Sequence, residues 1–429
     1  MQATYQLDFT EELKKCVKCG TCRAHCPLFV ELIGEPASPR GRLALVKQLH
    51  EGKIKPSQEL ADIVYTCLLC KNCAVNCPSG VISDEIFLAA RDYLNTALGQ
   101  GVLKKAILKG FLTRPGLLYA CSSLGRIYQK IGLHNLLTKA NLFEHLPEKI
   151  GAVGKIMPDI TRKPARARIP AVTPAKGEKK FKVAYFLGCA TNLAYPDVPV
   201  AGVKALSHNG CEVLTLEGVK CCGMPHMAYG ETATAIDLAK HNLEILLRGD
   251  YDAIVCDCAS CTSTFKETYS HLFAPETKEY ARAQQLKAKT YDLNEFLIKK
   301  TGIKPGSQAG EKAEKVKVTY HDPCHLKRAQ NIFKEPRQLL KSIPGVEFVE
   351  MKEADRCCGS AGSFTVMHHD LSMKVLAKKI ANAAKVEPDY VATCCPTCTM
   401  QLSYGLKKAG SKARVVHPVQ LLAETYKDR

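Results

Sequence analysis

Two cysteine runs near the start of this chain constrain its fold more than any other feature. In each run three cysteines are spaced by two residues, and a fourth follows three residues later, directly before a proline. Three thiolates at this spacing can bind three corners of one [4Fe–4S] cube, so the fourth corner must come from elsewhere. The pattern therefore predicts a small helical domain built around two ferredoxin-type clusters. The runs are Cys16-x2-Cys19-x2-Cys22-x3-Cys26-Pro27 and Cys67-x2-Cys70-x2-Cys73-x3-Cys77-Pro78.

The ligands of these two clusters are expected to cross between the runs. In two-cluster ferredoxins the cysteine before the proline binds the cluster of the other run. Zinc is the alternative metal for C-x2-C pairs, but its sites do not use a duplicated run of four at these spacings. The predicted ligands are Cys16, Cys19, Cys22 and Cys77 for the first cluster, and Cys67, Cys70, Cys73 and Cys26 for the second.

The second half of the chain contains an internal repeat with matched cysteines. FKVAYFLGC, ending at Cys189, matches VKVTYHDPC, ending at Cys324, and a Cys-Cys-Gly triplet and a C-x2-C pair follow in each half. The matched cysteines are offset by 135 to 137 residues. The first set is Cys189, Cys221, Cys222, Cys258 and Cys261, and the second is Cys324, Cys357, Cys358, Cys395 and Cys398.

Each five-cysteine set predicts one further [4Fe–4S] cluster. Five thiols exceed the four that a cubane uses, so the cluster is either noncubane or accompanied by a spare, reactive thiol. Buried structural cysteines are the alternative, and the match of all ten positions across two halves disfavours it.

The spacing of the repeat also predicts its fold. Short β-branched runs such as VAYF, CEVLTL and YDAIVC alternate with helical stretches, which is typical of parallel sheets built from βαβ units. The cysteines follow these runs, at the carboxyl edge where open α/β sheets place their sites. We expect a mixed α+β and α/β protein with four parts: a two-cluster ferredoxin-type domain at 1–99, a basic helical segment and Pro-rich linker at 100–180, a first repeat domain at 181–303 and a second at 316–429.

Composition favours metal ligation over disulfides. The chain has 22 cysteines among 429 residues, no secretory leader pattern at its start and no apolar run of membrane-spanning length. Disulfides are rare in the reducing cytosol, so we expect a cytoplasmic protein that can contact the inner face of a membrane. Four clusters of about −2 each would offset roughly half of the formal charge of +18. Residues 155–182 carry an excess of positive charge. They form either a solvated linker or a surface that contacts an anionic bilayer or an acidic partner.

Other groups near the motifs have ordinary structural interpretations. We predict hydrogen-bonding roles rather than ligand roles for His226, His321 and His325. No dinucleotide or P-loop glycine motif is present, so the sequence assigns no catalytic residue and no FAD or NAD site, and a flavin would lie on another chain. Four cysteines stay outside the ligand sets: Cys121 and Cys211, expected in the core, and Cys256 and Cys394, near the C-x2-C pairs.

Two ferredoxin motifs followed by two Cys-Cys-Gly repeats resemble a known superfamily across nearly the whole chain. It includes the iron–sulfur subunit of glycolate oxidase, the C subunit of anaerobic glycerol-3-phosphate dehydrogenase and the catalytic subunit of membrane-linked heterodisulfide reductase. The stretches SPRGRLALVKQLHEGK, CLLCKNCAVNCPSGV and CCGSAGSF are most similar to the glycolate oxidase branch. One departure is that both C-x2-C pairs are complete, as in heterodisulfide reductases, whereas glycolate oxidase members often have incomplete ones.

The resemblance implies an iron–sulfur electron-transfer subunit of a flavin-dependent glycolate or D-lactate dehydrogenase. Its electrons would come from a partner subunit containing FAD and pass toward a quinone or cytochrome acceptor at the membrane. Such a subunit would be inactive alone. The alternative is a heterodisulfide-reductase-type catalytic subunit that reduces a disulfide at noncubane clusters. Nucleic-acid binding is disfavoured, because no aromatic residues are interspersed with the charges of the basic linker.

Overall fold

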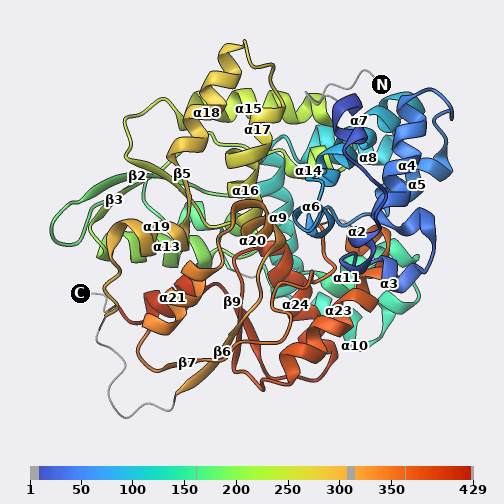
Figure 1. The fold of residues 1–429 in the computed structure, drawn as a ribbon. Helices are drawn as coiled ribbons and strands as arrows, with labels where there is room; N and C mark the ends of the chain where they lie inside the picture. Colours follow the sequence, from blue (N-terminus) through green and yellow to red (C-terminus); the bar gives the residue numbers. More distant parts are fainter. Residues whose placement is uncertain (1–8, 161, 307–314, 363, 427–429) are drawn as a thin grey trace.

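The computed structural model describes residues 9–160, 162–306, 315–362 and 364–426. Within these ranges a helical N-terminal region and a second helical segment precede two α/β units, each with its own sheet of mainly parallel strands (Figure 1). The predicted mixed fold class is confirmed.

The N-terminal region is helical because short amphipathic stretches are capped at their starts. Ser38 and Ser57 each accept a hydrogen bond from a backbone N–H of the first turn that follows, which satisfies one free donor of that helix. The apolar faces of α4 and α7 pack in one buried core. The elements are α1 (Phe9–Lys14), α2 (Thr21–Ala24), α3 (Phe29–Leu32), η1 (Glu35–Ala37), α4 (Pro39–His50), α5 (Gln58–Tyr65), α6 (Asn72–Val75) and α7 (Ser83–Leu98).

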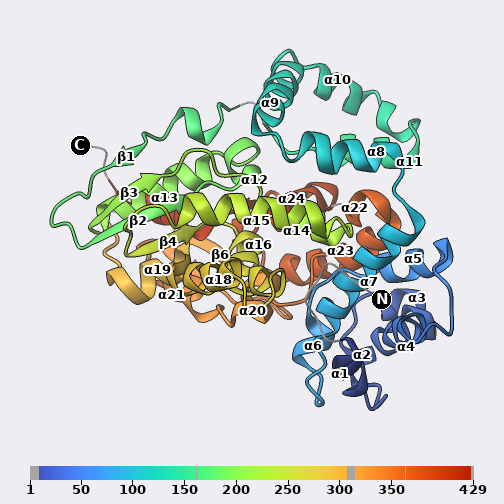
Figure 2. The same ribbon diagram turned by 90° about the horizontal axis from the view of Figure 1, so that it is seen from above.

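A second helical segment follows, and Figure 2 shows α9 and α10 at the top of the view with α8 and α11 below them. Its helices are separated at two residues, since α9 begins at Pro115 and Gly132 has a left-handed φ of 77° before α10. The elements are α8 (Val102–Lys105), η2 (Ala106–Phe111), α9 (Pro115–Lys130), α10 (Leu133–Lys139), η3 (Leu142–Glu144), α11 (Glu148–Ile156) and η4 (Ala165–Ala167).

The Pro-rich linker is bound to the first α/β unit rather than fully solvated. The Arg166 guanidinium donates to the carbonyl oxygens of Thr215, at 3.0 Å, and Leu216. Asp197 pairs with Arg168 at 2.7 Å and also with Arg162. Two arginines of the linker therefore share one carboxylate, and a third is held by backbone carbonyls.

The first α/β unit has a five-stranded sheet in the order β1-β3-β2-β4-β5, with only β1 antiparallel to its neighbour. Its strands are β1 (Val172–Thr173), β2 (Phe181–Phe186), β3 (Cys211–Thr215), β4 (Ala253–Cys256) and β5 (Thr290–Asp292). Its helices are α12 (Cys189–Leu193), α13 (Asp197–His208), α14 (Met224–Ala228), α15 (Thr232–Leu246), α16 (Ala259–Ser263), η5 (Thr264–Thr268), α17 (Tyr269–His271), α18 (Lys278–Lys289), α19 (Leu293–Phe296) and η6 (Leu297–Thr301).

The second unit repeats this topology with four parallel strands in the order β7-β6-β8-β9. Its strands are β6 (Val316–Tyr320), β7 (Val346–Phe348), β8 (Tyr390–Ala392) and β9 (Arg414–Val416). Its helices are α20 (Cys324–Gln330), α21 (Lys334–Ser342), α22 (Phe364–Met367), α23 (His369–Ala384), α24 (Pro396–Lys408) and α25 (Pro418–Glu424).

This strand order determines where the cysteine sets lie on each sheet. The chain order reverses between β2 and β4 in the first sheet, and between β6 and β8 in the second. Open α/β sheets bind their ligands outside the carboxyl ends of the strands at such a reversal. Cys189 and Cys258 follow the strands at the first reversal, and Cys324 and Cys395 follow those at the second. One continuous apolar core joins both units.

Candidate metal centres

The four cysteines assigned to the first ferredoxin cluster lie together. Cys22 has Cys16, Cys19 and Cys77 as electrostatic neighbours, and all four line one cavity. Burial raises the pKa of the Cys22 thiol. Cys19 is exposed, and the Thr21 hydroxyl, 3.4 Å from its sulfur, lowers the pKa of that thiol. The structure thus brings Cys77 beside three cysteines that lie far from it in sequence.

Backbone conformation explains how each run turns its thiols toward one cavity. In both runs the residues before and after the middle cysteine have left-handed φ values: Lys18 at 57° and Gly20 at 89°, then Leu69 at 49° and Lys71 at 60°. This conformation is strained for residues other than glycine, so surrounding contacts must hold it. The Lys71 ammonium pairs with Asp84 at 2.7 Å, which is one such contact.

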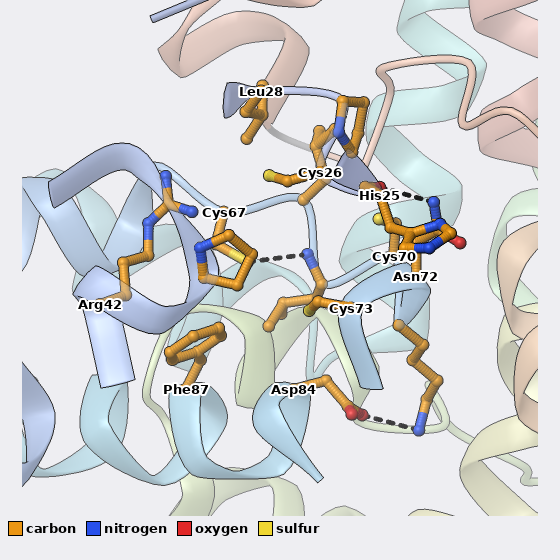
Figure 3. Close-up of a pocket in the computed structure, with 15 residues that line it drawn as sticks. His25, Cys26, Leu28, Arg42, Cys67, Cys70, Asn72, Cys73, Asp84 and Phe87 are labelled. Carbon is orange, nitrogen blue, oxygen red and sulfur yellow. Dashed lines mark hydrogen bonds and ion pairs between the residues drawn. The ribbon is translucent and has the colours of Figure 1, made fainter. Parts of the chain in front are cut away.

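The second ferredoxin group surrounds the cavity in Figure 3, with Cys26, Cys67, Cys70 and Cys73 facing it. Burial raises the pKa of the Cys26 thiol, and the nearby Arg42 guanidinium opposes that rise. Arg42 is 1% exposed, and its Nη2 has no hydrogen-bond partner within the described ranges. A buried guanidinium with an unsatisfied nitrogen beside four thiols suits an anionic cluster.

The first five-cysteine set converges at the carboxyl edge of its sheet. The Cys189 thiol is a hydrogen-bonding neighbour of Cys221, and the Cys222 thiol is one of Cys261. Cys258 in turn neighbours Cys261. Because hydrogen bonds from Cys221 and Cys261 stabilise its thiolate, the pKa of Cys222 is lowered.

The second set converges in the same way. Cys324 neighbours Cys357, and Cys395 neighbours Cys398. The sulfur atoms of Cys358 and Cys398 lie 3.5 Å apart. All five thiols are free, as in the first set, so each set offers five sulfur ligands and no disulfide.

Two contacts connect these groups across domain boundaries. The Cys70 thiol of the second ferredoxin group lies in one buried cluster with Cys357 of the second repeat, and this proximity and burial raise the pKa of Cys70. Cys258 of the first repeat likewise neighbours Cys395 of the second. Cys73 of the second ferredoxin group also lines the cavity of the first group. The four groups therefore form one series: first ferredoxin group, second ferredoxin group, second repeat, first repeat.

Buried cations accompany this series. Arg91, 4% exposed, donates to the Cys67 carbonyl at 2.8 Å, and Arg328 donates to the Cys70 carbonyl at 3.1 Å. Lys379 is fully buried beside the second repeat set. Iron–sulfur clusters bound by thiolates are anionic, so buried positive charge would compensate them. The donor sets and their surroundings fit such clusters.

The histidines divide into two groups. The ring Nε2 of His226 hydrogen-bonds to the Leu108 carbonyl at 2.9 Å, and that of His325 to the Leu69 carbonyl at 3.4 Å, as predicted. The ring of His321 behaves differently, because it lies within 4.8 Å of the sulfurs of Cys358 and Cys398. The sequence prediction missed this proximity. The signal was present, since histidine replaces phenylalanine at the matched position of an otherwise similar run.

The cysteines outside the sets show mixed agreement with expectation. Cys211 is fully buried in β3, as predicted. The prediction for Cys121 is wrong, because α9 presents this side chain to solvent. Cys394 hydrogen-bonds with the Asn294 amide and the Tyr320 hydroxyl, each at 3.2 Å. Its sulfur is therefore bound by groups that do not belong to the second set.

Two ferredoxin-type cysteine groups and two cysteine-rich α/β repeats define an iron–sulfur protein of the electron-transfer class. A 4Fe–4S dicluster domain matches residues 12–81, a cysteine-rich domain matches 183–266 and 318–403, and the glycolate oxidase iron–sulfur subunit linker region matches 99–157. The chain belongs to the glycolate oxidase iron–sulfur subunit family, as the relatives below also show.

The chain is similar along much of its length to three proteins whose names state different functions. The "Probable glycolate oxidase iron-sulfur subunit" of Bacillus subtilis is 33% identical over 96% of this chain and 94% of its own length. A subunit of the dihydromethanophenazine:CoB–CoM heterodisulfide reductase of Methanosarcina barkeri is 27% identical over 96% of this chain and 94% of its own length. The "Lactate utilization protein A" of Bacillus velezensis is 31% identical over 56% of this chain and 98% of its own length.

Within the described ranges, no helix combines the length and apolar character that a membrane crossing requires.

Proposed function

We propose that this chain is the electron-transfer subunit of a flavin-dependent 2-hydroxyacid dehydrogenase, acting on glycolate or D-lactate. Electrons would pass from an FAD-containing partner subunit through four iron–sulfur clusters toward a quinone or cytochrome at the membrane. The proposed ligands are the two crossed ferredoxin groups and the two five-cysteine sets. Each cluster supplies single-electron transfer when bound, whereas oxidation of a hydroxyacid releases two electrons, which a flavin can divide.

The continuous series of cysteine groups is the observation that supports this function best. Electron transfer between centres slows steeply with distance, so a conducting protein must place its centres close together. The contact of Cys70 with Cys357 joins the second ferredoxin group to the second repeat, and that of Cys258 with Cys395 joins the two repeats. Such an arrangement supports electron transfer from one end of the series to the other.

We further propose that α8 to α11 contact an anionic bilayer near the acceptor. The exposed side chains of Leu124 and Ile127 on α9, and of Ile131 at its C-cap, are spaced by three and four residues, so they form one apolar stripe. Residues 101–160 contain nine Lys and Arg but only three Asp and Glu. An apolar stripe flanked by positive charge is typical of helices that lie in a membrane interface.

The main test uses the anaerobically reconstituted chain with glycolate or D-lactate. We expect about 16 irons per chain, no oxidation by the chain alone, and turnover with cluster bleaching when the FAD-containing partner is added. Iron near half that amount would contradict cluster binding by the repeats. Full reduction of a heterodisulfide by this chain with an artificial reductant, without gain from any flavoprotein, would instead favour the catalytic alternative.

The membrane contact has its own test in sedimentation with vesicles. The chain should bind phosphatidylglycerol vesicles several-fold better than phosphatidylcholine vesicles, and less at high salt. The double variant L124E/I127E should lose this binding, while the control Val172→Glu, at an exposed apolar residue of β1, should keep it. A double variant that binds vesicles normally but fails to bind the FAD-containing partner would assign the stripe to that protein instead.

A further inference from the structure

The two repeats differ at one position directly beside their cysteines. In the matched runs FKVAYFLGC and VKVTYHDPC, Phe186 corresponds to His321, and each lies three residues before the first cysteine of its set. The Phe186 ring packs edge-on against Phe265, with ring centroids 4.7 Å apart. The first repeat therefore has only carbon at this position, where the second has an imidazole.

The His321 imidazole is placed as a ligand would be. A ring nitrogen lies within 4.8 Å of the sulfurs of Cys358 and Cys398, which are 3.5 Å from each other. The side chain is 1% exposed, and its Nδ1 has no hydrogen-bond partner within the described ranges. Leaving a buried polar nitrogen unsatisfied is destabilising, so an additional interaction at this nitrogen is expected.

We propose that His321 donates an imidazole nitrogen to the metal centre of the second repeat, making that centre a mixed nitrogen–sulfur site while the first stays all-sulfur. This inference rests on the proposed function, since it requires that the second five-cysteine set binds an iron–sulfur cluster. The donor atoms are suitable, because imidazole nitrogen and thiolate sulfur are both established ligands of iron in clusters.

The chemical consequence is a difference in reduction potential between two otherwise similar centres. The second set still offers five thiols, so the imidazole would bind in place of one of these thiolates. The centre then carries less negative charge, and an added electron is better stabilised. The second repeat centre, which lies between the ferredoxin groups and the first repeat, would then have the higher potential of the two. The difference would arise from one side chain at one strand end.

His325 provides a matched control. It is half-buried near the second set, and its Nδ1 also lacks a hydrogen-bond partner among the described residues. Its other ring nitrogen, however, bonds to the Leu69 carbonyl, and it does not join the cluster of donor atoms formed by His321, Cys358 and Cys398. Replacement of His325 should therefore leave the spectrum of the centre unchanged.

The test is pulsed EPR on the fully reconstituted chain, with and without ¹⁵N-histidine labelling. The signal of the second repeat is identified by its loss in Cys357→Ser. We expect a strong histidine nitrogen coupling in that signal, its loss in His321→Phe together with a lower potential, and its retention in His325→Gln. Labelling of the unaltered protein detects the coupling even where a variant fails to fold.

The outcomes separate the two proposals. A full complement of iron with no histidine coupling in the second repeat signal would overturn the role of His321 alone. Iron short by about one cluster, with no signal from the second set, would overturn cluster binding at that set and this inference with it.

Discussion

The two repeat units share a scaffold but surround their cysteines with different charges. The strand order and direction are the same around both five-cysteine sets. Beside the first set lie the neutral buried groups Tyr269 and Asn242, which donates to the Cys221 carbonyl at 3.0 Å, and the buried carboxyl of Asp257, directly before Cys258. Beside the second set lie the cations Arg328 and Lys379. The ligand positions have stayed matched while their surroundings differ, so two centres of similar construction are expected to have different reduction potentials.

The largest expected difference between the repeats concerns their positions in the series. Cys357→Ser should remove the second repeat centre and also separate the ferredoxin groups from the first repeat, because Cys357 is the contact of Cys70. Cys221→Ser should remove only the terminal centre. Each variant should lose about four irons, but only Cys357→Ser should slow reduction of the remaining repeat centre by orders of magnitude. Iron analysis and rapid-mixing EPR measure both effects.

Reduction of the first repeat at an unchanged rate in Cys357→Ser would contradict the proposed series. Electrons would then enter the first repeat by another route, and the contact between Cys70 and Cys357 would have only a structural role.

A second difference separates the repeats from the ferredoxin region. Each repeat collects its cysteines within one unit, whereas the ferredoxin groups exchange one cysteine each. Cys77→Ser should therefore damage the centre at Cys16, Cys19 and Cys22 and leave that at Cys67 nearly intact. EPR of the single variants, with Cys26→Ser as the reciprocal case, measures this. Damage confined to the run that contains Cys77 would show that the ligands do not cross.

The same contrast explains what could be predicted from the sequence. The strands predicted from β-branched runs such as VAYF, CEVLTL and YDAIVC, and from their counterparts in the second repeat, are present, and cysteines follow them at matched offsets. The strands β1, β5 and β9 were missed, because two or three residues such as TYD or RVV carry too little pattern and form strands only through their neighbours in the sheet. Contacts between the sets, such as Cys70 with Cys357, depend on domain packing and have no local signal.

Lys379 offers a smaller test of the charge difference between the repeats. Its buried ammonium donates to the carbonyl oxygens of Glu353, at 2.5 Å, and Ala354, at 3.1 Å. Lys379→Met would leave both carbonyls unsatisfied and should lower the free energy of unfolding by about 2–4 kcal/mol. It should also lower the potential of the second repeat centre by removing nearby positive charge.

The control for this variant is Lys374→Met, on the exposed side of the same helix α23. Thermal unfolding and a redox titration of both variants complete the test. Equal potentials in Lys379→Met and in the control would show that the cation stabilises the fold without tuning the centre.

The smallest expected effect concerns the buried N-cap residues of the helices that follow the last strand of each sheet. Asp292 accepts hydrogen bonds from backbone N–H groups at the start of α19, and His417 accepts one at the start of α25. Burial raises the pKa of Asp292 to about 6 and lowers the pKa of His417 to about 3. The two caps therefore respond to pH with opposite signs.

The folded pKa of Asp292 lies above its unfolded value, so its contribution is fully present in acid and decreases as the pH rises toward 6. The folded pKa of His417 lies below its unfolded value, so its contribution is present at neutral pH and decreases as the pH falls below about 6.5. Between pH 5 and pH 7 the change should be about 1 kcal/mol for Asp292 and about 2 kcal/mol for His417.

Asparagine can cap either helix without titrating. Relative to the unaltered chain, Asp292→Asn should therefore gain thermal stability as the pH rises across this range, and His417→Asn should gain it as the pH falls. Parallel pH profiles for both variants and the unaltered chain would show that neither cap changes its protonation on folding.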